Sequence, residues 1–441
     1  MAIDADTQPF DVLDRMSPSE LTEWWQQRVG DVVRAAGNLD FYRPRFEAAG
    51  FDPSTFETLD DLRRLPLFRK DDVLAEQRRT GRALAGLERL TPDGRAILTM
   101  SSGTKGSTFL AWPEPWRQMQ GRSAMRGHHW VGLRPGAPLV LAAPAWHAYA
   151  AIQTYLAEEL ELPCIVVAGT YLPRFADRIL DAIVTFRPRF VSMFLPMAFS
   201  LLAEGRRRGL ADRDVFAGVD RLLVVGAPIT PGMRAHLQAV TGIEQVSELA
   251  GSSENFLAVE CHLHVGLHLV PDTCYAEVLS REGDERAAAG ERGRLVHTTT
   301  VPWGSLYVRY DGGDAATFDP SPCPCGLPSP RVKVVGRWDD AFRLGSQTLL
   351  PYDVQAAIEA VAPEFTGAQA AILAEGLAEG RLELVVESPA SGNGGRHLAE
   401  GLRAIFDAPV DIRWSDRLDL QFKGVVAVVG RGQAPEEGQH R

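Results

Sequence analysis

Apolar residues recur along this chain with two different periods, and each period predicts a different kind of element. Between residues 17 and 49 they return every three or four positions, as at Leu21, Trp25 and Val29, which predicts a helical N-terminal region. From about residue 96 to residue 300, short apolar runs alternate with longer stretches of helical spacing. Strands separated by helices imply parallel crossover connections, so this part of the chain predicts an α/β sheet.

The individual elements of that stretch follow from the same pattern. The runs that predict strands are 96–100, 109–112, 138–143, 164–168, 190–194, 221–225 and 244–248. Helical spacing predicts helices over 148–160 and 175–186, whereas 293–300 and 306–310 favour antiparallel strands.

The pattern changes after residues 336–340, where a second kind of domain is expected. The helices predicted there are 353–361 and 394–406, and the strands are 369–373, 382–387, 411–414 and 425–429. This is a compact α+β unit of about the hundred residues typical of a small domain. We therefore expect an α/β protein with a large N-terminal domain of layered parallel and mixed sheets, residues 1–337. A small, mobile α+β domain follows, residues 338–441, and its tail from Gly432 onward is expected to be disordered.

Composition and charge narrow the class of protein. The 441 residues, 45% apolar and 23% charged, are typical of a soluble globular protein. The net charge of −11 argues against a nucleic-acid-binding surface, because neutralising phosphates needs clustered cations. The acidic N-terminus lacks the pattern of a signal peptide, no apolar stretch is long enough to span a bilayer, and five cysteines are too few for a disulfide scaffold. We therefore expect a cytoplasmic protein that binds neither nucleic acid nor membrane, and the sequence leaves a homodimer open.

The stretch Thr99-Met-Ser-Ser-Gly-Thr-Lys-Gly-Ser-Thr108 carries the first sign of chemistry. It follows a predicted strand and consists almost wholly of hydroxyls, glycines and one lysine. Small residues let the backbone approach a polyphosphate, hydroxyls and amides donate to its oxygens, and Lys105 adds a charge. A flexible surface turn explains the loop equally well when it is taken alone. The spacings typical of P-loop hydrolases and of Rossmann dinucleotide folds are both missing.

Four further segments follow this loop in a fixed order. Leu223–Pro228 is a strand that ends in small residues, where an open parallel sheet places its ligand crevice. Glu248–Glu254 offers hydroxyls and a carboxylate that suit a magnesium ion held against phosphates. Val308–Asp314 ends in a carboxylate that can accept bonds from ribose hydroxyls, and Gly336–Asp340 stands where a hinge would. A plain turn or a surface ion pair explains each segment alone, but not the order and spacing of all of them.

With these segments the chain resembles the phenylacetate–CoA ligase-like branch of the adenylate-forming enzymes, the superfamily of acyl-CoA synthetases, adenylation domains and luciferases. The resemblance runs from about Phe41 to Val429. The matching segments are Phe41–Phe46, Leu62–Asp72, Ser101–Thr104, Gly251–Glu254, Gly266–His268, Arg309 and Tyr310 with Asp314, Cys323–Gly326 and Gly336–Asp340.

This resemblance implies a two-step reaction. A carboxylate attacks the α-phosphate of ATP, which gives an acyl-adenylate and pyrophosphate, and a nucleophile then displaces AMP. Donors and cations aimed at the phosphate oxygens lower the first barrier, because charge builds on the five-coordinate phosphorus. The resemblance implies a small aromatic carboxylic acid as substrate, Mg²⁺ as cofactor, ATP as co-substrate and CoA as the acyl acceptor.

The resemblance also assigns roles to residues of this sequence. The phosphate-binding residues would be Ser101, Ser102, Gly103, Thr104, Lys105 and Gly106, the adenine-side turn Gly226, Ala227 and Pro228, and the second nucleotide-binding segment Ala250, Gly251, Ser252 and Ser253. Glu254 would hold magnesium and Asp314 the ribose, and Arg337 would lie near the ribose and phosphate. Asp339 would be the hinge about which the small domain turns between the half-reactions.

This sequence departs from the family pattern at three places. The family loop usually reads S-S-G-T-T-G-K, whereas here the lysine stands at position 105 and Ser107 holds its usual place. The family's R-Y-R-T-R-D is here Arg309–Asp314, with two cations lost. Lys423 is the best match to the catalytic lysine of the C-terminal domain, but it lacks the usual neighbours.

A tetrahedral metal site is also indicated. Cys261, Cys323 and Cys325 supply three thiols and His268 an imidazole, a set that suits structural zinc, and in this branch a similar set binds zinc. Buried cysteines are often simply small apolar residues. The histidines that compete with His268 as the fourth ligand are His262 and His264.

The substrate pocket is indicated only by a local match. Trp146, His147 and Tyr149 match the family segment that brings an aromatic residue to the substrate. Together with Phe194 and Pro196 they would wall an aromatic acid, although core packing explains the same side chains.

Two other interpretations stay open. After adenylation, the acyl acceptor could be an amine or a carrier-protein thiol in place of CoA. The chain could also be a non-catalytic member of the fold that binds a nucleotide or an acyl ligand. The altered loop, the lost cations and the surroundings of Lys423 favour this second interpretation more than a clean family member would.

Overall fold

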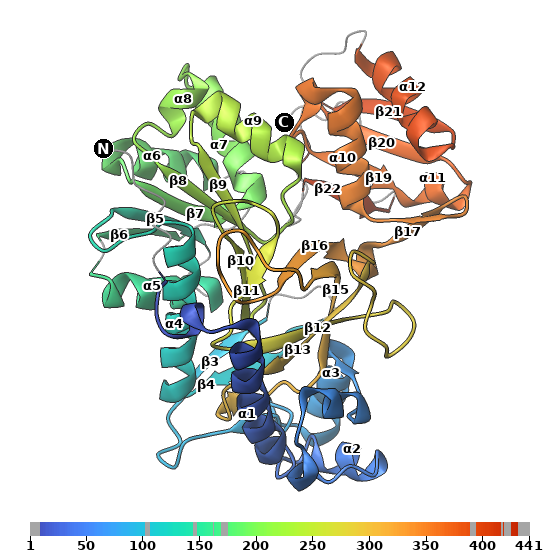
Figure 1. Ribbon diagram of the computed structural model, residues 1–441. Coiled ribbons are helices and arrows are strands. Elements are labelled where there is room, and N and C mark those ends of the chain that lie inside the picture. Colours follow the sequence, from blue (N-terminus) through green and yellow to red (C-terminus); the bar gives the residue numbers. More distant parts are fainter. Residues whose placement is uncertain are drawn as a thin grey trace. The chain divides into compact units, whose positions relative to one another are not determined.

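The computed structural model describes residues 9–101, 106–143, 148–161, 163–168, 175–388, 394–415, 418 and 425–430 (Figure 1). Its contacts divide the chain into two units, residues 1–166 with 247–334 and residues 167–246 with 335–441. The predicted boundary between residues 337 and 338 stays a prediction, and the predicted disordered tail lies outside the described residues.

The first unit begins with helices, as the N-terminal pattern predicts. Ser17 caps α1 (Pro18–Ala36), because its hydroxyl accepts from the Glu20 N–H while the Glu20 carboxylate accepts from the Ser17 N–H at 2.7 Å. Leu21 and Trp25 lie on the buried face of this helix. The other helical elements of the unit are η1 (Leu13–Arg15), α2 (Arg43–Ala48), η2 (Pro53–Thr55), η3 (Leu59–Arg64), α3 (Lys70–Thr80), α4 (Glu114–Trp130) and α5 (Ala148–Glu159).

The strands of the first unit belong to one large sheet or to two short antiparallel pairs. They are β1 (Phe68–Arg69), β2 (Glu88–Arg89), β3 (Ile97–Met100), β4 (Phe109–Trp112), β5 (Leu139–Ala143), β6 (Cys164–Ala168), β9 (Gln245–Gly251), β10 (Phe256–Glu260), β11 (Leu267–Leu269), β12 (Cys274–Leu279), β13 (Gly293–Thr299), β14 (Gly304–Ser305), β15 (Tyr310–Asp319) and β16 (Arg331–Arg337). The limits of the unit fall inside β6, β9 and β16.

The order of these strands decides which loops can share a site. Within the unit the large sheet runs β12-β13-β15-β16-β11-β10-β9, and β1 adds to β15 as a parallel neighbour. The antiparallel pairs β9–β10 and β10–β11 bring the turn after β9 and the turn after β10 to opposite ends of the same strands. Separately, β3 pairs with β4 and β2 with β14.

The second unit contains an α/β segment and an α+β segment. The first has α6 (Ala176–Phe186), β7 (Phe190–Phe194), α7 (Leu195–Arg207), α8 (Asp212–Val215), β8 (Arg221–Val225) and α9 (Pro231–Thr241), and β7 and β8 are parallel. The second has η5 (Trp338–Asp340), β17 (Phe342–Leu344), β18 (Gln347–Leu349), α10 (Pro351–Val361), η6 (Pro363–Phe365), β19 (Ala370–Leu373), α11 (Ala374–Ala378), β20 (Leu382–Glu387), α12 (Gly394–Phe406), β21 (Val410–Ser415) and β22 (Val426–Val429).

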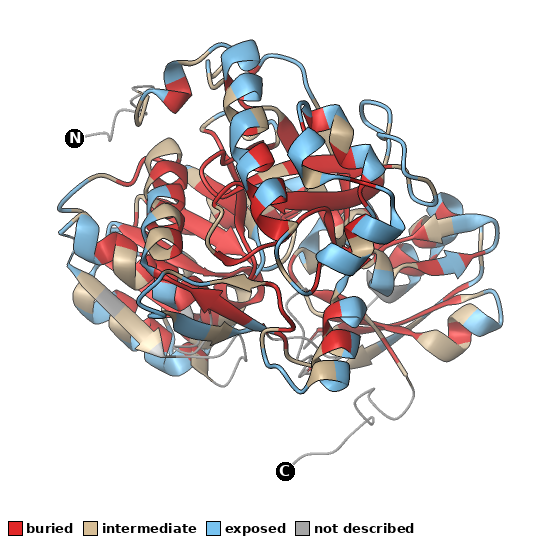
Figure 2. Ribbon diagram, turned by 90° about the horizontal axis from the view of Figure 1, so that it is seen from below, coloured by how far each residue is buried: buried red, intermediate tan, exposed pale blue. Residues whose placement is uncertain are grey.

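The α+β segment has its own core. Its sheet runs β21-β20-β19-β22, and Ala370 and Ile372 of β19 pack in the same cluster as Val354 of α10 and Leu402 of α12. Since successive side chains of a strand point to opposite faces, α10 and α12 cover one face of this sheet. Many strands are buried along most of their length, whereas the helices show a buried and an exposed side (Figure 2).

The predicted fold class is confirmed: parallel and mixed strands alternate with helices, and an α+β segment follows. One predicted strand is wrong. Residues 306–310 were expected to be extended, but β15 starts only at Tyr310. Arg309 has a φ of +54°, which an extended strand cannot contain, so the chain turns there before the strand begins.

Candidate active site

The ends of the predicted phosphate loop are held together by a set of short bonds. Ser101 follows β3 and Thr108 precedes β4, so the β3–β4 pair carries the loop between them. The Ser101 N–H donates to the Thr108 carbonyl at 2.9 Å, and the Thr108 N–H donates to Ser101 Oγ at 3.1 Å. The two hydroxyls lie 2.8 Å apart. Ser102, Gly103, Thr104 and Lys105 lie outside the described residues, whereas Gly106 has a φ of +125°, which suits only glycine.

Lys70 reaches this loop from a distant part of the sequence. Its Nζ donates to Ser101 Oγ at 3.1 Å. Lys70 is the first residue of α3, and the short parallel strand β1 directly before it pairs with β15. Sequence reasoning gave this residue no role, although it lies in the matching segment Leu62–Asp72. A lysine at the start of a helix in that segment was the available signal.

Glu254 lies in the turn between β9 and β10. The Ser252 N–H donates to the Asn255 carbonyl at 2.9 Å, and the Glu254 N–H donates to Ser252 Oγ at 3.3 Å, so the turn is closed on itself. Glu254 has only 5% of its surface exposed and Ser253 7%. Ala250 and Gly251 are the last two residues of β9, and they pair with Ala258 and Phe256 of β10.

Buried polar groups without partners lie beside this turn. Within the described residues, neither the Tyr307 hydroxyl nor the Asn255 side-chain amide has a hydrogen-bond partner. Burial raises the pKa of Tyr307, and the charge of Glu254 raises it further, so this hydroxyl lies within electrostatic range of Glu254. Buried polar atoms without partners are rare in folded proteins and mark places where water or ligands bind. The surroundings of Glu254 therefore have the capacity to bind a polar ligand.

The segment 309–314 contains two carboxylates with different surroundings. Asp311 is buried, and it accepts from Arg69 Nε at 2.9 Å and from Arg294 at 3.0 Å. Asp314, the predicted ribose ligand, is only partly buried on β15. Arg309 is fully buried and bonds to the Leu65 carbonyl and to Asp284. Asp311 and Arg309 therefore have structural partners, and the role predicted for Asp314 stays a prediction.

The predicted adenine-side turn lies in the second unit, between β8 and α9. Gly226 has a φ of +85°, and a Cβ there would overlap the Phe194 ring, so only glycine fits both the turn and the packing. Gly226 is exposed, and Ala227 and Pro228 are partly buried. Phe194 itself ends β7 and is 2% exposed. The turn therefore rests on a residue that was predicted for the acyl pocket.

The other predicted pocket residues divide between buried and undescribed positions. Tyr149 lies in the first turn of α5 and Pro196 in the first turn of α7, and both are buried. Trp146 and His147 lie outside the described residues.

The predicted hinge and catalytic residues of the C-terminal part are only partly described. Arg337 ends β16, and its guanidinium lies 3.9 Å from the Asp339 carboxylate, with about half of each side chain exposed (50% each). Lys423 lies outside the described residues.

The structure brings the four predicted metal ligands together in the first unit. The ligand atoms of Cys261, His268, Cys323 and Cys325 all lie within 4.8 Å of one another. Cys261 follows β10, His268 lies in β11, and Cys323 and Cys325 lie in the loop between β15 and β16. The Cys261 and Cys323 sulfurs are 4.0 Å apart, close to the about 3.8 Å between two thiolates on one tetrahedral zinc ion.

A hydrogen bond to a backbone carbonyl orients the imidazole of His268 in this cluster. His268 Nδ1 lies 2.9 Å from the Ser329 carbonyl, and its Nε2 lies 3.3 Å from the Cys325 sulfur. Because the carbonyl can only accept, Nδ1 carries the proton and Nε2 presents its lone pair to the thiols. A hydrogen bond from Cys325 lowers the pKa of the Cys261 thiol. The donor set and its support fit zinc.

The competing histidines have other surroundings. His264 Nδ1 lies 3.1 Å from the Glu260 carboxylate, and neither His264 nor His262 belongs to the cluster that the described residues form. The structure therefore favours His268 among the three.

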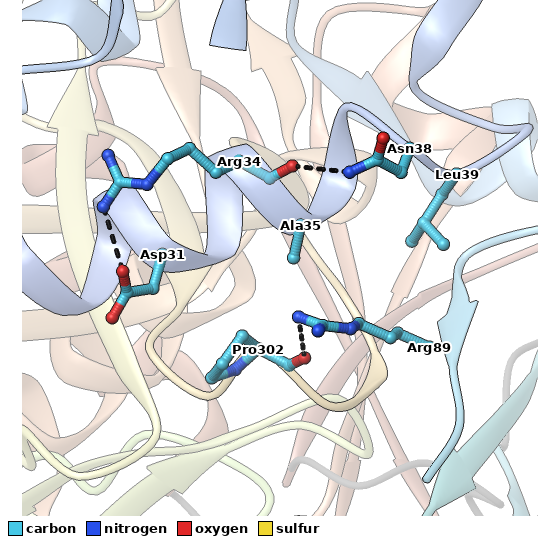
Figure 3. Close-up of a pocket in the computed structure, with 7 residues that line it drawn as sticks. All are labelled: Asp31, Arg34, Ala35, Asn38, Leu39, Arg89 and Pro302. Carbon is cyan, nitrogen blue, oxygen red and sulfur yellow. Dashed lines mark hydrogen bonds and ion pairs between the residues drawn. The ribbon is translucent and has the colours of Figure 1, made fainter. Parts of the chain in front are cut away.

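A surface pocket of about 600 Å³ contains none of the predicted site residues (Figure 3). Its lining is Asp31, Arg34, Ala35, Asn38, Leu39, Arg89 and Pro302. Arg34 pairs with Asp31 at 2.9 Å, and Arg89 donates to the Pro302 carbonyl at 3.2 Å. Because these side chains bond to one another, we assign the pocket no ligand.

No family model matches the sequence. The chain is 26% identical over 364 residues to the phenylacetate-coenzyme A ligase of Thermus thermophilus, a match that covers 80% of this chain and 78% of that protein. It is also 26% identical over 359 residues to the phenylacetate-coenzyme A ligase of Aromatoleum evansii, covering 78% of this chain and 76% of that protein.

The fold matches solved structures over nearly the whole chain. A 2-hydroxyisobutyryl-CoA ligase in the postadenylation state aligns with a TM-score of 0.84 at 20% identity, covering 97% of this chain and 94% of that one. The same ligase in complex with 2-HIB-AMP and CoA aligns with a TM-score of 0.70 at 21% identity, covering 97% and 95%.

The fold is that of the adenylate-forming CoA ligases. The sequence relatives narrow this class, and the predicted resemblance to its phenylacetate–CoA ligase-like branch is confirmed. Among the described helices, none combines the length and the hydropathy that a membrane span needs.

Proposed function

We propose that this protein is an AMP-forming acid–thiol ligase, which activates a small carboxylic acid with ATP and transfers the acyl group to CoA. The observation that carries the proposal is the match to a phenylacetate-coenzyme A ligase over 80% of the chain. The fold that the chain shares with a ligase solved with an acyl-AMP and CoA adds support.

In the first half-reaction, the loop between Ser101 and Thr108 receives the β- and γ-phosphates of ATP. Its own hydroxyls and N–H groups, together with Lys105, donate to the phosphate oxygens, and Lys70 brings a second ammonium group to the base of the loop. This second cation offsets the loss of the lysine that the family has at position 107. Positive charge there lowers the barrier, because negative charge grows on the departing pyrophosphate as the carboxylate attacks the α-phosphorus.

Glu254 is the carboxylate that would hold Mg²⁺ in this site. It lies in a closed turn beside the Tyr307 hydroxyl and the Asn255 amide, which have no hydrogen-bond partner in the described part of the chain. These groups fit an oxygen-rich environment for a hard cation and its waters. When bound, the ion neutralises phosphate charge. Asp314 accepts from the ribose hydroxyls, the turn at Gly226, Ala227 and Pro228 lies along the adenine, and Arg337 lies near the ribose and phosphate.

The acid that we propose is a small aromatic one. The sequence relatives are phenylacetate-coenzyme A ligases, and the pocket predicted here is formed by Trp146, His147, Tyr149, Phe194 and Pro196. The buried position of Phe194 against Gly226 supports an apolar wall next to the nucleotide.

We also propose a structural zinc ion on Cys261, His268, Cys323 and Cys325. All four positions are taken by protein ligands, which leaves none for a water or substrate, so the ion would close the turns around β10, β11 and the β15–β16 loop and take no part in the reaction. A cytoplasmic location remains our expectation, and a homodimer stays open.

The test is ATP–pyrophosphate exchange with a panel of carboxylic acids. We expect label to return into ATP with aryl acids and not without acid. Product analysis with CoA, amines and a carrier protein as acceptors then separates the CoA ligase from an amide synthetase and from a carrier-protein ligase. Exchange with none of the acids would overturn the proposal and favour a non-catalytic binding protein of this fold.

A further inference from the structure

Helices α9 and α10 both belong to the second unit and contact each other (Figure 1). Helix α10 places the carboxylate of Glu359 at the start of α9. Thr230 is the N-cap of α9, and its hydroxyl donates to Glu359 Oε2 at 2.5 Å. The same hydroxyl accepts from the Met233 N–H at 3.1 Å. One side chain therefore caps α9 and at the same time binds α10.

The carboxylate of Glu359 has partners for both of its oxygens. Gln355, one turn earlier on α10, donates to Glu359 Oε1 at 2.7 Å. The carboxylate also lies close to Gly232 in the first turn of α9, where an anion is stabilised by the N-terminus of a helix. Thr230 is 1% exposed, Gln355 3% and Glu359 8%, so the contact is shielded from solvent. Burial raises the pKa of Glu359, and these hydrogen bonds oppose that rise.

Glycines make room for this contact on both sides. A Cβ at Gly232 would overlap the Glu359 carboxylate, and a Cβ at Gly367, just after η6, would overlap the Phe199 ring of α7. Residues 195–241 and residues 351–367 therefore interlock at two places, each of which depends on a missing side chain.

The contact lies close to the predicted adenine-side turn, because Thr230 follows that turn closely in the sequence. Thr230 stands two residues after Pro228, the last residue of the predicted adenine-side turn. The chain passes from the exposed Gly226 to the buried Thr230 within four positions. A nucleotide that fixes the turn also fixes the backbone of Thr230, and with it the direction of the hydroxyl that Glu359 accepts from.

We propose that Glu359 is a positioning residue that couples the adenine-side turn to the C-terminal segment, so that nucleotide binding favours the arrangement that performs adenylation. The inference rests on the proposed function, in which the C-terminal domain turns between the two half-reactions. The contact is made for the first half-reaction and released for the second.

The test compares the two half-reactions in Glu359→Gln, in Thr230→Val and in Thr230→Ser, which keeps the hydroxyl. We expect Glu359→Gln and Thr230→Val to lower ATP–pyrophosphate exchange at least about tenfold, while thioester formation from supplied acyl-adenylate stays within about twofold of the unmodified protein. Thr230→Ser should retain exchange. Glu364→Gln, an exposed glutamate five residues along the chain, is the matched control and should change neither rate.

A third disruptive variant, after Glu359→Gln and Thr230→Val, tests whether a loss of exchange comes from the coupling or from a less stable helix. Gly232→Ala adds a methyl group that displaces the Glu359 carboxylate, yet alanine favours the helix in which it lies. We expect the same selective loss of exchange without a fall in melting temperature. Unchanged exchange in all three disruptive variants, or an equal loss in both half-reactions, would overturn the coupling alone. An unmodified protein without exchange for any acid would overturn the proposed function, and the coupling with it.

Discussion

Lys70 and Ser101 are brought together by two unrelated segments, the start of α3 and the end of β3. The position of Lys70 depends on β1, because Arg69 pairs with the buried Asp311 of β15 directly before the lysine. The bond to Ser101 therefore has a rigid support, as a charge intended for phosphate requires.

Replacing Lys70 by methionine removes this charge but keeps the length of the side chain. We expect Lys70→Met to lower the rate of ATP–pyrophosphate exchange by about ten- to a hundredfold, because one cation at a developing phosphate charge is worth about 1.5–3 kcal/mol. Lys333→Met is the matched control, since Lys333 is an exposed residue of β16. Equal rates for Lys70→Met and the control would assign Lys70 to packing of the loop only.

Two buried histidines, His128 and His297, make the stability of the protein depend on pH. Burial lowers the pKa of His128 and of His297 from 6.5 to about 4. The folded protein thus disfavours the protonated ring, so each histidine contributes stability that is complete above about pH 6.5 and is lost as the pH falls toward 4.

The variant His297→Phe keeps an aromatic ring beside Tyr310 and removes the titrating group. Between pH 7 and pH 5 the unmodified protein should lose about 2 kcal/mol of unfolding free energy through this residue. Urea unfolding at both pH values should show a smaller loss in His297→Phe and an unchanged loss in His397→Gln, where the histidine is exposed. The same pH dependence in His297→Phe would contradict the assignment.

At the scale of elements, the metal cluster joins the turn after β10 and the next strand, β11, to the β15–β16 loop, which lies far along the sequence. A bound ion would therefore cross-link the antiparallel β10–β11–β16 part of the sheet. Because a site of this kind does not exist in the unfolded chain, the free energy of metal binding adds to that of folding.

Metal analysis of the purified protein should find one zinc ion per chain. Cys323→Ser should lose that zinc and melt several degrees lower, whereas Cys164→Ser, in β6 and outside the cluster, should keep both the metal and the melting temperature. If Cys323→Ser melted like the unmodified protein and neither contained zinc, the cluster would be a set of packed cysteines.

The elements themselves were largely predictable from periodicity, and their contacts were not. The helix over 175–186 and the strand over 190–194 agree with α6 and β7 within one residue, because local spacing fixes which face is buried. Arg309 escaped prediction, since its positive φ depends on bonds to Leu65 and Asp284 far away in sequence.

In the candidate site, too, the local segments were predictable from the sequence, whereas the contacts between distant segments were not. Motif order predicted the loop at Ser101 and the turn at Glu254, and the four ligands of the metal cluster lie together as the resemblance implies. The bond of Lys70 to the loop and the contact of Glu359 with Thr230 join residues 31 and 129 positions apart, and no single segment contains both partners. From the sequence, three histidines were candidates for the fourth ligand position. The bond of His268 Nδ1 to the Ser329 carbonyl favours His268 among them.

At the scale of the whole molecule, the proposed C-terminal domain supplies different side chains to the two half-reactions, and Lys423 would serve the first. Lys423→Ala should therefore slow ATP–pyrophosphate exchange far more than thioester formation from supplied acyl-adenylate. Lys333→Ala should change neither rate. Equal losses in both half-reactions of Lys423→Ala would mean that this lysine is not the catalytic one.

The central claim is that the acid is activated as its mixed anhydride with AMP, and the fate of the carboxylate oxygen tests it most directly. An acid labelled with oxygen-18 in its carboxylate is turned over with ATP, Mg²⁺ and CoA, and the nucleotide product is examined by mass spectrometry. Because the carboxylate oxygen attacks the α-phosphate and the thiol then breaks the acyl carbon–oxygen bond, the account predicts AMP that carries one oxygen-18 atom. Label in inorganic phosphate with ADP as the nucleotide product, or turnover that leaves AMP unlabelled, would contradict it.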